Sequence, residues 1–281
     1  MSTTRLIWIT TVLLAGQSTA PSSLPAQRSA PTDTLIDVGG HRLHLRSWAG
    51  RGALTIVFEA GGGADLTAWG TVPARLAGKT ALRIVAYDRA GMGQSDLGPQ
   101  TLTPFDEIAQ LDRALDTLGI KRIVLVGHSY GGMLSLYHAA RHPDRVVGLV
   151  LVDPMNPIFI DKVTLAWLNT TVPDFPDPKT PQEIVTSRLK STMPAFADSA
   201  RRTLPSIRVP MVVITAGVPW FGKPPIDSAW RESHEALVAG GKPREFVIAA
   251  KSKHDIPDTE PEVIVGAIER LLSLVERASK P

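Results

Sequence analysis

The sequence predicts an α/β fold in which a mostly parallel sheet carries helices on both faces. Short, unbroken apolar runs rich in Val and Ile recur along the chain, as buried parallel strands do. They alternate with longer stretches whose apolar residues have helical spacing, and this alternation is typical of strand–helix–strand units. The expected strands are 34–48 (two short strands around the Gly39-Gly40 turn), 54–59, 83–88, 122–127, 146–152, 211–215 and 245–249. The expected helices are 65–78, 104–118, 133–141, 226–239 and 261–277.

Residues 154–208 interrupt this alternation with many prolines and two weakly periodic helical stretches. We expect a single domain over residues 34–281, with 154–208 inserted as a small helical cap over the carboxyl edge of the sheet, where open parallel sheets place their sites. Several large apolar residues in or near this cap are interpreted first as its core, although they can also line an acyl pocket: Met155, Phe159, Trp167, Trp220 and Trp230.

The first residues have the pattern of a secretory signal peptide. A positive start at Arg5 precedes the apolar run 6–16, which small polar residues follow. At about 1.5 Å per residue that run covers only ~16 Å, too little for a hydrocarbon core of ~30 Å. We therefore expect residues 1–26 to be a signal peptide, with cleavage after Ala20 or Ala26, and the mature protein to be secreted or periplasmic without a stable membrane span. An uncleaved membrane anchor or a frayed N-terminus is the alternative interpretation.

Composition excludes several classes of function. The 281 residues include no cysteine, which excludes disulfides, Cys-ligated zinc, iron–sulfur clusters and a thiol nucleophile. Lys and Arg number 30 against 27 Asp and Glu, a net charge of +3. So small a surplus, spread along the chain, gives no argument for a nucleic-acid partner.

The strongest local motif is Gly127-His128-Ser129-Tyr130-Gly131. An apolar strand precedes it and a helical pattern follows, which is the context that a Gly-x-Ser-x-Gly motif needs in order to be informative. Glycines two residues before and after the serine remove Cβ atoms that would clash in a tight strand-to-helix turn. Ser129 is therefore expected at the edge of the sheet and at the start of a helix, as a candidate nucleophile.

Five segments together resemble the α/β-hydrolase superfamily: VFEAGGG (57–63), YDRAGMGQSD (87–96), VGHSYGG (126–132), LVLVDP (149–154) and KHDIPDTEP (253–261). The resemblance covers nearly the whole of residues 34–281. It implies the α/β-hydrolase fold, a Ser–acid–His triad in that chain order, and backbone donors for an oxyanion. It also implies chemistry that needs no metal and no organic cofactor.

The base of the triad is assigned to His254. Of the seven histidines, His254 is the one in a loop directly after a late strand, where the resemblance places the base. A serine hydroxyl needs such a base because it is a poor nucleophile at neutral pH. His128 adjoins Ser129 in the chain, but its side chain is expected to point away from it.

The acid is assigned to Asp153, with two alternatives. The usual position in the resembling family follows the strand 211–215, yet here no carboxylate occurs in that loop before Asp227. Some members carry the acid one strand earlier, and Asp153 ends that strand. Asp227 and Asp255 stay open as alternatives, and a turn role before Pro154 is the other interpretation of Asp153.

The oxyanion hole implied by the resemblance consists of the backbone N–H groups of Gly62 and Tyr130, each worth about 3 kcal/mol in the transition state. Many relatives have His-Gly where this chain has Ala60-Gly61. Because the donors are backbone groups, that departure leaves the chemistry possible. A structural ion pair between Asp88 and Arg89 is expected beneath the site.

These residues predict a secreted serine hydrolase that cleaves small-molecule carboxylic esters. Amide, lactone or thioester hydrolysis and acyl transfer are alternatives on the same scaffold, and a non-catalytic binding protein is an alternative of another class. Ser129 argues against dehalogenase or epoxide-hydrolase chemistry, for which relatives use Asp at that position.

Overall fold

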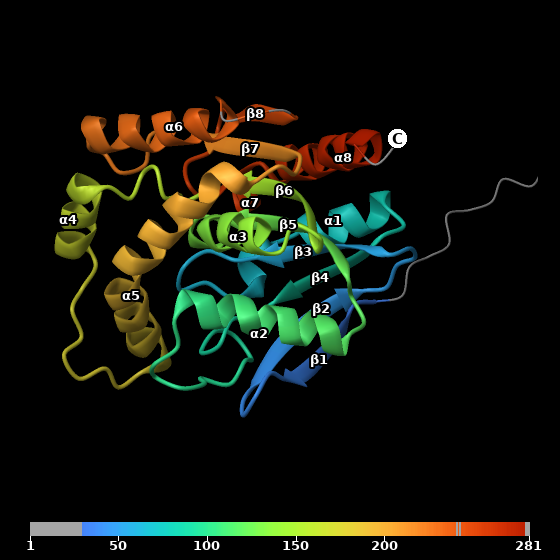
Figure 1. Cartoon of the computed structure of the whole chain (residues 1–281), viewed down its shortest axis with the longest axis horizontal. Helices are drawn as coiled ribbons and strands as arrows, with labels where there is room; N and C mark the ends of the chain where they lie inside the picture. Colours follow the sequence, from blue (N-terminus) through green and yellow to red (C-terminus); the bar gives the residue numbers. More distant parts are fainter. Residues whose placement is uncertain (1–29, 240, 242, 279–281) are drawn as a thin grey trace, which may run out of the picture.

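The computed structural model describes residues 30–239, 241 and 243–278, so the expected signal peptide lies outside the described residues. An eight-stranded sheet runs through the molecule in the order β1-β2-β4-β3-β5-β6-β7-β8 (Figure 1). Its strands are β1 (Thr32–Asp37), β2 (Arg42–Trp48), β3 (Leu54–Glu59), β4 (Arg83–Tyr87), β5 (Arg122–His128), β6 (Val146–Val152), β7 (Met211–Ala216) and β8 (Arg244–Ala249).

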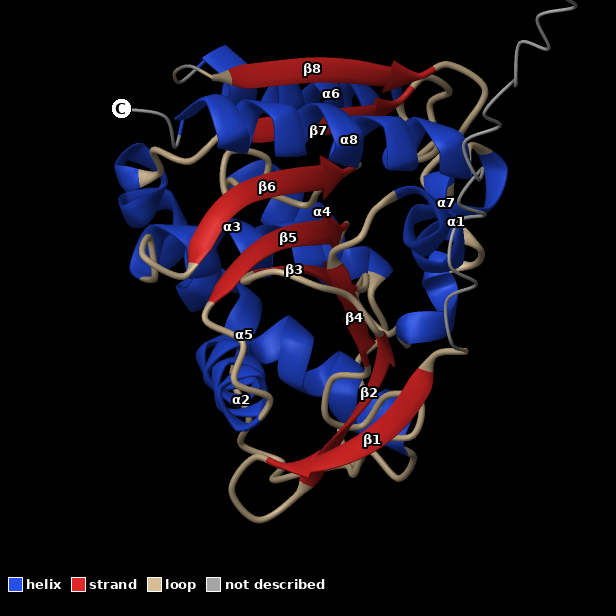
Figure 2. Cartoon of the chain, turned by 90° about the vertical axis from the view of Figure 1, so that its right-hand side faces the viewer, coloured by secondary structure: helices blue, strands red, loops and turns tan. Residues whose placement is uncertain are grey.

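The sheet is mixed at one end and parallel elsewhere. The β1–β2 and β2–β4 pairs are antiparallel, and the pairs that follow, from β4–β3 to β7–β8, are parallel. Figure 2 shows the sheet twisting from β8 at its top to β1 at its bottom. The predicted fold class is confirmed. Because β3, β5, β6, β7 and β8 are parallel, the loops that follow them all leave from one edge of the sheet.

Helices cover both faces of the sheet. They are α1 (Val72–Lys79), α2 (Pro104–Thr117), α3 (Tyr130–Arg141), α4 (Lys162–Thr171), α5 (Pro181–Thr203), α6 (Pro224–Ala239), α7 (Ile256–Thr259) and α8 (Pro261–Ala278), with 3-10 turns η1 (Leu66–Trp69) and η2 (Leu204–Ser206). Successive side chains of a strand point to opposite faces. Val124 and Val126 of β5 therefore pack with α1 and α8, whereas Ile123 and Leu125 pack with α2, α3 and α6.

The expected helix over 65–78 is wrong as one element, because Gly70 divides it into η1 and α1. Gly70 has a φ of 50° and donates its N–H to the Thr67 carbonyl at 2.9 Å, which closes the 3-10 turn. Leu66, Trp69 and Leu76 are nevertheless all buried in the same core. The apolar spacing predicts that shared buried face and cannot reveal the break in the backbone.

The segment between β6 and β7 contains α4, α5 and η2. Helix α5 begins at a capping box, in which Thr180 and Glu183 satisfy one another's backbone N–H groups. A third apolar cluster joins this segment to α3 and α6, and includes Met133, Phe159, Met193, Phe196 and Trp230. In Figure 1 α4 and α5 lie on the left, beyond α3. Across the described part of the chain, no helix combines the length and the apolar character that crossing a bilayer requires.

Candidate active site

Ser129 occupies a sharp turn between β5 and α3. Its backbone angles are φ 51° and ψ −121°, a conformation that costs a non-glycine residue about 1–3 kcal/mol. A Cβ atom at Gly127 would lie 2.6 Å from the Gly131 carbonyl oxygen, and one at Gly131 would lie 2.3 Å from that of Glu59. The turn therefore needs glycine at both positions, which is the physical reason for the Gly-x-Ser-x-Gly spacing.

Asp153 is completely buried at the end of β6, beside Ser129. The Ser129 N–H donates to the Val152 carbonyl at 3.1 Å. Oδ2 of Asp153 lies 2.7 Å from Nδ1 of His254, and its Oδ1 accepts the N–H of Ala216 at 2.9 Å. Burial would raise the pKa of Asp153, but the His254 hydrogen bond, the nearby His234 and the Ala216 amide together hold it below its ordinary value. The carboxylate is therefore ionised at neutral pH.

His254 lies in the loop after β8 and is held from two sides. Because its Nδ1 faces a carboxylate, that nitrogen carries the proton and Nε2 is the free base. Its carbonyl oxygen accepts the Nε2–H of His128 at 2.9 Å, and the two imidazole rings are 4.6 Å apart. Burial, and then repulsion from the neighbouring His254 imidazole when that ring is protonated, lowers the pKa of His128 to about 4, so His128 is neutral at pH 7.

The two other candidate acids have different partners. Asp227 in α6 accepts the backbone N–H groups of Trp220, Phe221 and Lys223 at 3.0–3.1 Å, and so fixes the loop after β7. Asp255 is the N-cap residue of the short helix α7, where its backbone carbonyl accepts the N–H groups of Asp258 and Thr259 and its side chain makes no capping hydrogen bond. The structure thus brings Asp153 into contact with His254 and gives Asp227 the role of holding a loop.

That loop carries Trp220, whose ring stacks on His254 with centroids 4.3 Å apart and planes 15° apart. Phe221 stacks on Trp220 in turn, at 3.7 Å. The sequence places Trp220 in or near the expected cap, with core as its first interpretation, and does not predict this contact with the imidazole. A tryptophan in a loop has no periodicity to reveal its partner, so no signal in the sequence identifies the stack.

The Ala60–Gly63 segment follows β3 and lies against the serine turn. A Cβ atom at Gly61 would be 3.5 Å from the Cβ of Ser129, and one at Gly62 would be 3.4 Å from that of Tyr130. Gly62 and Tyr130 therefore lie on neighbouring loops beside Ser129. These are the two backbone positions at which the sequence analysis expects oxyanion donors.

The expected ion pair between Asp88 and Arg89 is wrong. Arg89 instead pairs with Glu59 at 2.5 Å, and both side chains are buried. Asp88 accepts from His44, from the Leu66 N–H at 2.7 Å and from the Gln94 N–H. Adjacent residues in an extended segment point in opposite directions, so Asp88 and Arg89 cannot face each other. The sequence signal that could have identified Glu59 is a carboxylate at the end of the otherwise apolar, buried strand β3.

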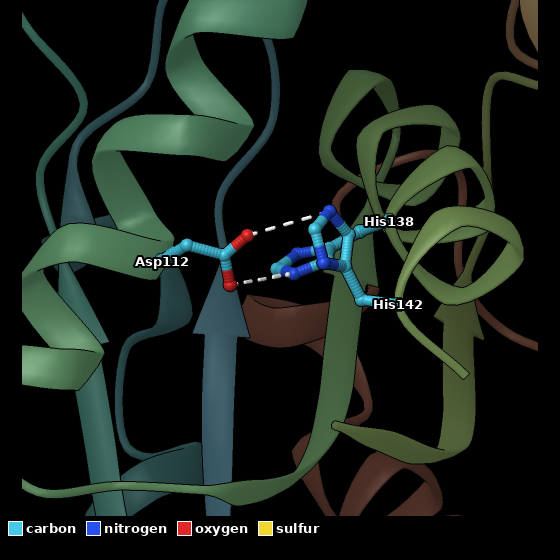
Figure 3. Close-up of side chains that lie close together, drawn as sticks. All are labelled: Asp112, His138 and His142. Carbon is cyan, nitrogen blue, oxygen red and sulfur yellow. Dashed lines mark hydrogen bonds and ion pairs between the residues drawn. The ribbon is translucent and has the colours of Figure 1, made fainter. Parts of the chain in front are cut away.

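A cluster at the far end of α3 has spacing that a metal ion could use. His138 and His142 lie one turn apart and face Asp112 of α2, with nitrogen–oxygen distances of 3.1 and 3.5 Å (Figure 3). Arg145, however, already places its guanidinium 3.0 Å from the same carboxylate. With a permanent cation in place, the cluster is explained as an ion-pair network joining α2 to α3.

A family model described as the alpha/beta hydrolase family matches residues 56–279. The chain belongs to the alpha/beta hydrolase family. It is 25% identical to an uncharacterized protein, YqjL, of Bacillus subtilis over 251 residues, which are 86% of this chain and 92% of that one. Membership of the family makes this protein a hydrolase.

Solved structures of other α/β hydrolases share the fold. A haloalkane dehalogenase from Bradyrhizobium elkani has a TM-score of 0.68 at 19% identity, over 89% of this chain and 100% of that one. An enol-lactonase from Burkholderia xenovorans has a TM-score of 0.60 at 21% identity, over 85% and 100%. At these identities the likeness establishes the architecture, and the named reactions belong to those proteins.

Proposed function

We propose that this α/β hydrolase is a serine esterase in which Ser129, His254 and Asp153 form the catalytic triad. The observation that carries the proposal is the 2.7 Å contact between the buried Asp153 carboxylate and Nδ1 of His254. It leaves Nε2 of His254 free to act as a base. Asp153 and His254 each border the serine turn, through Val152 and His128 respectively.

In the proposed reaction the Ser129 hydroxyl attacks the ester carbonyl while Nε2 of His254 takes its proton. Asp153 holds the imidazole in the required tautomer and stabilises the imidazolium. The N–H groups of Gly62 and Tyr130 receive the negative charge on the former carbonyl oxygen. His254 then gives the proton to the leaving alcohol, and a water molecule, activated by the same imidazole, hydrolyses the acyl-enzyme.

An apolar cavity between α4 and α5 supports a substrate with an apolar acyl group. Its lining includes Met155, Leu165, Leu168, Leu189 and Met193. Two of these residues also border the proposed centre. The N–H of Met155 donates to the Ser129 carbonyl at 2.9 Å, and a methyl of Leu189 lies 3.2 Å from where a Cβ of Gly62 would be. An acyl chain leaving the serine therefore meets apolar walls.

The test is labelling by a fluorophosphonate combined with hydrolysis of p-nitrophenyl esters of increasing chain length. The wild type should label at Ser129, and Ser129→Ala should lose the label and lower turnover by several orders of magnitude. Amides, lactones and thioesters in the same assay separate the alternative hydrolytic activities. A folded wild-type protein that neither labels nor hydrolyses any of these substrates overturns the proposal and favours a binding protein.

A further inference from the structure

We propose that Arg89 is a positioning residue that fixes the two loops of the oxyanion hole relative to each other. This inference rests on the proposed esterase function, since it concerns the donors assigned to Gly62 and Tyr130. Arg89 touches neither the substrate nor Ser129 in that scheme. It contacts both loops, is almost completely buried, and lies at the start of the loop that follows β4.

The guanidinium holds the first loop by its carbonyl groups. Nη1 of Arg89 donates to the Ala60 carbonyl at 2.7 Å, and Nη2 donates to the Gly61 carbonyl. The Gly61 carbonyl and the Gly62 N–H belong to one planar trans peptide group, in which they point in opposite directions. A guanidinium that holds this oxygen therefore orients the Gly62 N–H away from itself. Arg89 thus sets the direction of the first proposed donor through a single rigid peptide.

The second loop is held through the side chain of Tyr130. The guanidinium lies over the Tyr130 ring, 5.3 Å from its centroid, and the Tyr130 hydroxyl donates to Glu107 at 2.8 Å. Glu107 in turn lies 4.0 Å from Nε of Arg89. The residue that supplies the second donor through its backbone is therefore anchored to the same cation.

A buried acid, Glu59, and a partly buried one, Glu107, keep this cation in place. Glu59 accepts from Arg89 at 2.5 Å and from the Tyr87 hydroxyl. Burial would lower the pKa of Arg89, but Glu59 and Glu107 raise it, so the guanidinium is permanently charged. Its planar fork makes the carbonyl and carboxylate contacts at once, and a lysine ammonium cannot reproduce this geometry.

A purely structural role would make the same contacts, so the test must separate stability from transition-state binding. We would measure kcat and KM for a p-nitrophenyl ester of a short acyl chain, and the Kd of butylboronic acid. In the boronate adduct the Ser129 oxygen bonds to boron, the hydroxyl proton passes to His254, and boron takes the negative charge. The adduct therefore mimics the tetrahedral intermediate, whereas KM follows ground-state binding to a first approximation.

Arg89→Met should lower kcat about 10²-fold and raise the Kd of butylboronic acid by a similar factor, while KM stays within about 3-fold of the wild-type value. Arg89→Lys should have a kcat and a boronate Kd between those of Arg89→Met and the wild type. The matched control is Arg145→Met, which removes a second ion-paired arginine, this one partly buried and near the far end of α3. It should lower the melting temperature while leaving kcat and the boronate Kd unchanged.

Folded Arg89→Met protein whose kcat and boronate Kd both stay within 3-fold of wild type overturns the inference. If that variant does not fold, Tyr130→Phe and Arg89→Lys decide the question. Each should lose about 10-fold in both quantities, and wild-type values in both variants overturn the inference. A wild type that neither hydrolyses esters nor binds the boronate refutes the proposed function itself, a result distinct from an active wild type with unaffected variants.

Discussion

At the scale of single residues, two non-glycine residues of the proposed triad have a positive φ, which is an unfavourable backbone conformation. Ser129 has a φ of 51° and Asp153 a φ of 41°. Hydrogen bonds from neighbouring strands hold both, since Ser129 donates to Val152 and Asp153 donates to Ile214 at 2.7 Å. Such strain persists where the surrounding structure over-determines it. Here the two strained residues follow the adjacent strands β5 and β6.

Asp153→Asn should lower kcat about 10⁴-fold without unfolding the protein. The amide removes the charge that stabilises the imidazolium and the acceptor that fixes its tautomer. Asparagine tolerates a positive φ, so the backbone can remain as it is. Steady-state kinetics and circular dichroism measure the two effects. Near-normal turnover in this variant would show that His254 acts without Asp153.

His128 makes stability depend on pH. Its pKa is lowered to about 4 from an ordinary 6.5, so the unfolded chain binds more protons between these values and stability rises with pH across that window. The gain in the free energy of unfolding from His128 across this window approaches ~3 kcal/mol. His128→Gln keeps a donor for the His254 carbonyl and removes the titration. Urea unfolding between pH 4 and 7 should show a weaker pH dependence in the variant, with the buried His234, whose pKa is also lowered, leaving a residual slope of the same sign. Equal slopes in both proteins contradict the assignment.

At the scale of elements, the site depends on how closely α3 approaches β3 and its following loop. The backbone of Gly131 in α3 passes so near β3 that a Cβ atom would lie 2.3 Å from the Glu59 carbonyl and 2.4 Å from that of Ala60. Both partners are backbone atoms, which cannot rotate away. The serine turn and the Gly62 loop are therefore locked together by main-chain packing as well as by Arg89.

Gly131→Ala should destabilise the fold by more than ~3 kcal/mol and abolish ester hydrolysis, because α3 and β3 must separate to admit the methyl group. The matched control is Gly78→Ala in α1, where a Cβ atom meets nothing within 4 Å. That change should be neutral or stabilising by up to about 1 kcal/mol, since alanine favours helix. Thermal unfolding of the two variants measures the contrast, and equal stability would contradict the packing argument.

The loop after β7 gives a second prediction at this scale. Asp227→Ala leaves the N–H groups of Trp220, Phe221 and Lys223 without their acceptor and loosens the ring that stacks on His254. We expect kcat to fall about 3- to 10-fold and stability to fall by about 1–3 kcal/mol. Enzyme kinetics and urea titration check both values. A loss near 10⁴-fold would instead give Asp227 the role proposed for Asp153.

At the scale of the whole molecule, we propose that the segment between β6 and β7 selects the substrate and that the N-terminal residues determine where the protein acts. The segment between β6 and β7 packs on α3 through the apolar cluster that includes Phe196 of α5 and Met133 of α3, and its helices α4 and α5 line the cavity proposed for the acyl group. We propose that residues 1–26 direct export, on the pattern of Arg5 and the apolar run 6–16. The hydrolase would then meet its substrates outside the cytoplasm.

Expression of the full chain in a bacterial host should yield a mature form shortened by about the first 20–26 residues and found in the periplasm or medium. Intact-mass analysis of the fractions identifies the cleavage point. Arg5→Glu, which reverses the positive start, should retain the precursor in the cell. A full-length cytoplasmic product from the wild-type sequence contradicts the export proposal.

Much of this architecture follows from the sequence itself. Continuous Val and Ile runs such as 122–127 predict buried parallel strands, and the helical spacing from Phe105 to Leu115 predicts a helix on the sheet. The glycines at 127 and 131 predict the serine turn, because a local steric requirement leaves a local signature. Chain order, combined with a parallel sheet, then brings the residues after β5, β6 and β8 to one edge.

Only the tertiary structure decides which groups from distant segments meet there. In the structure Asp153 pairs with His254, and Trp220 stacks on the same imidazole. Asp227 instead binds the backbone of the loop after β7. Arg89 forms its ion pair with Glu59 and not with Asp88. Periodicity and turn preferences come from sterics among neighbours in the chain, and the sequence records those directly. A contact between residues a hundred positions apart depends on the twist of the sheet and the paths of the loops, which no single stretch of sequence records.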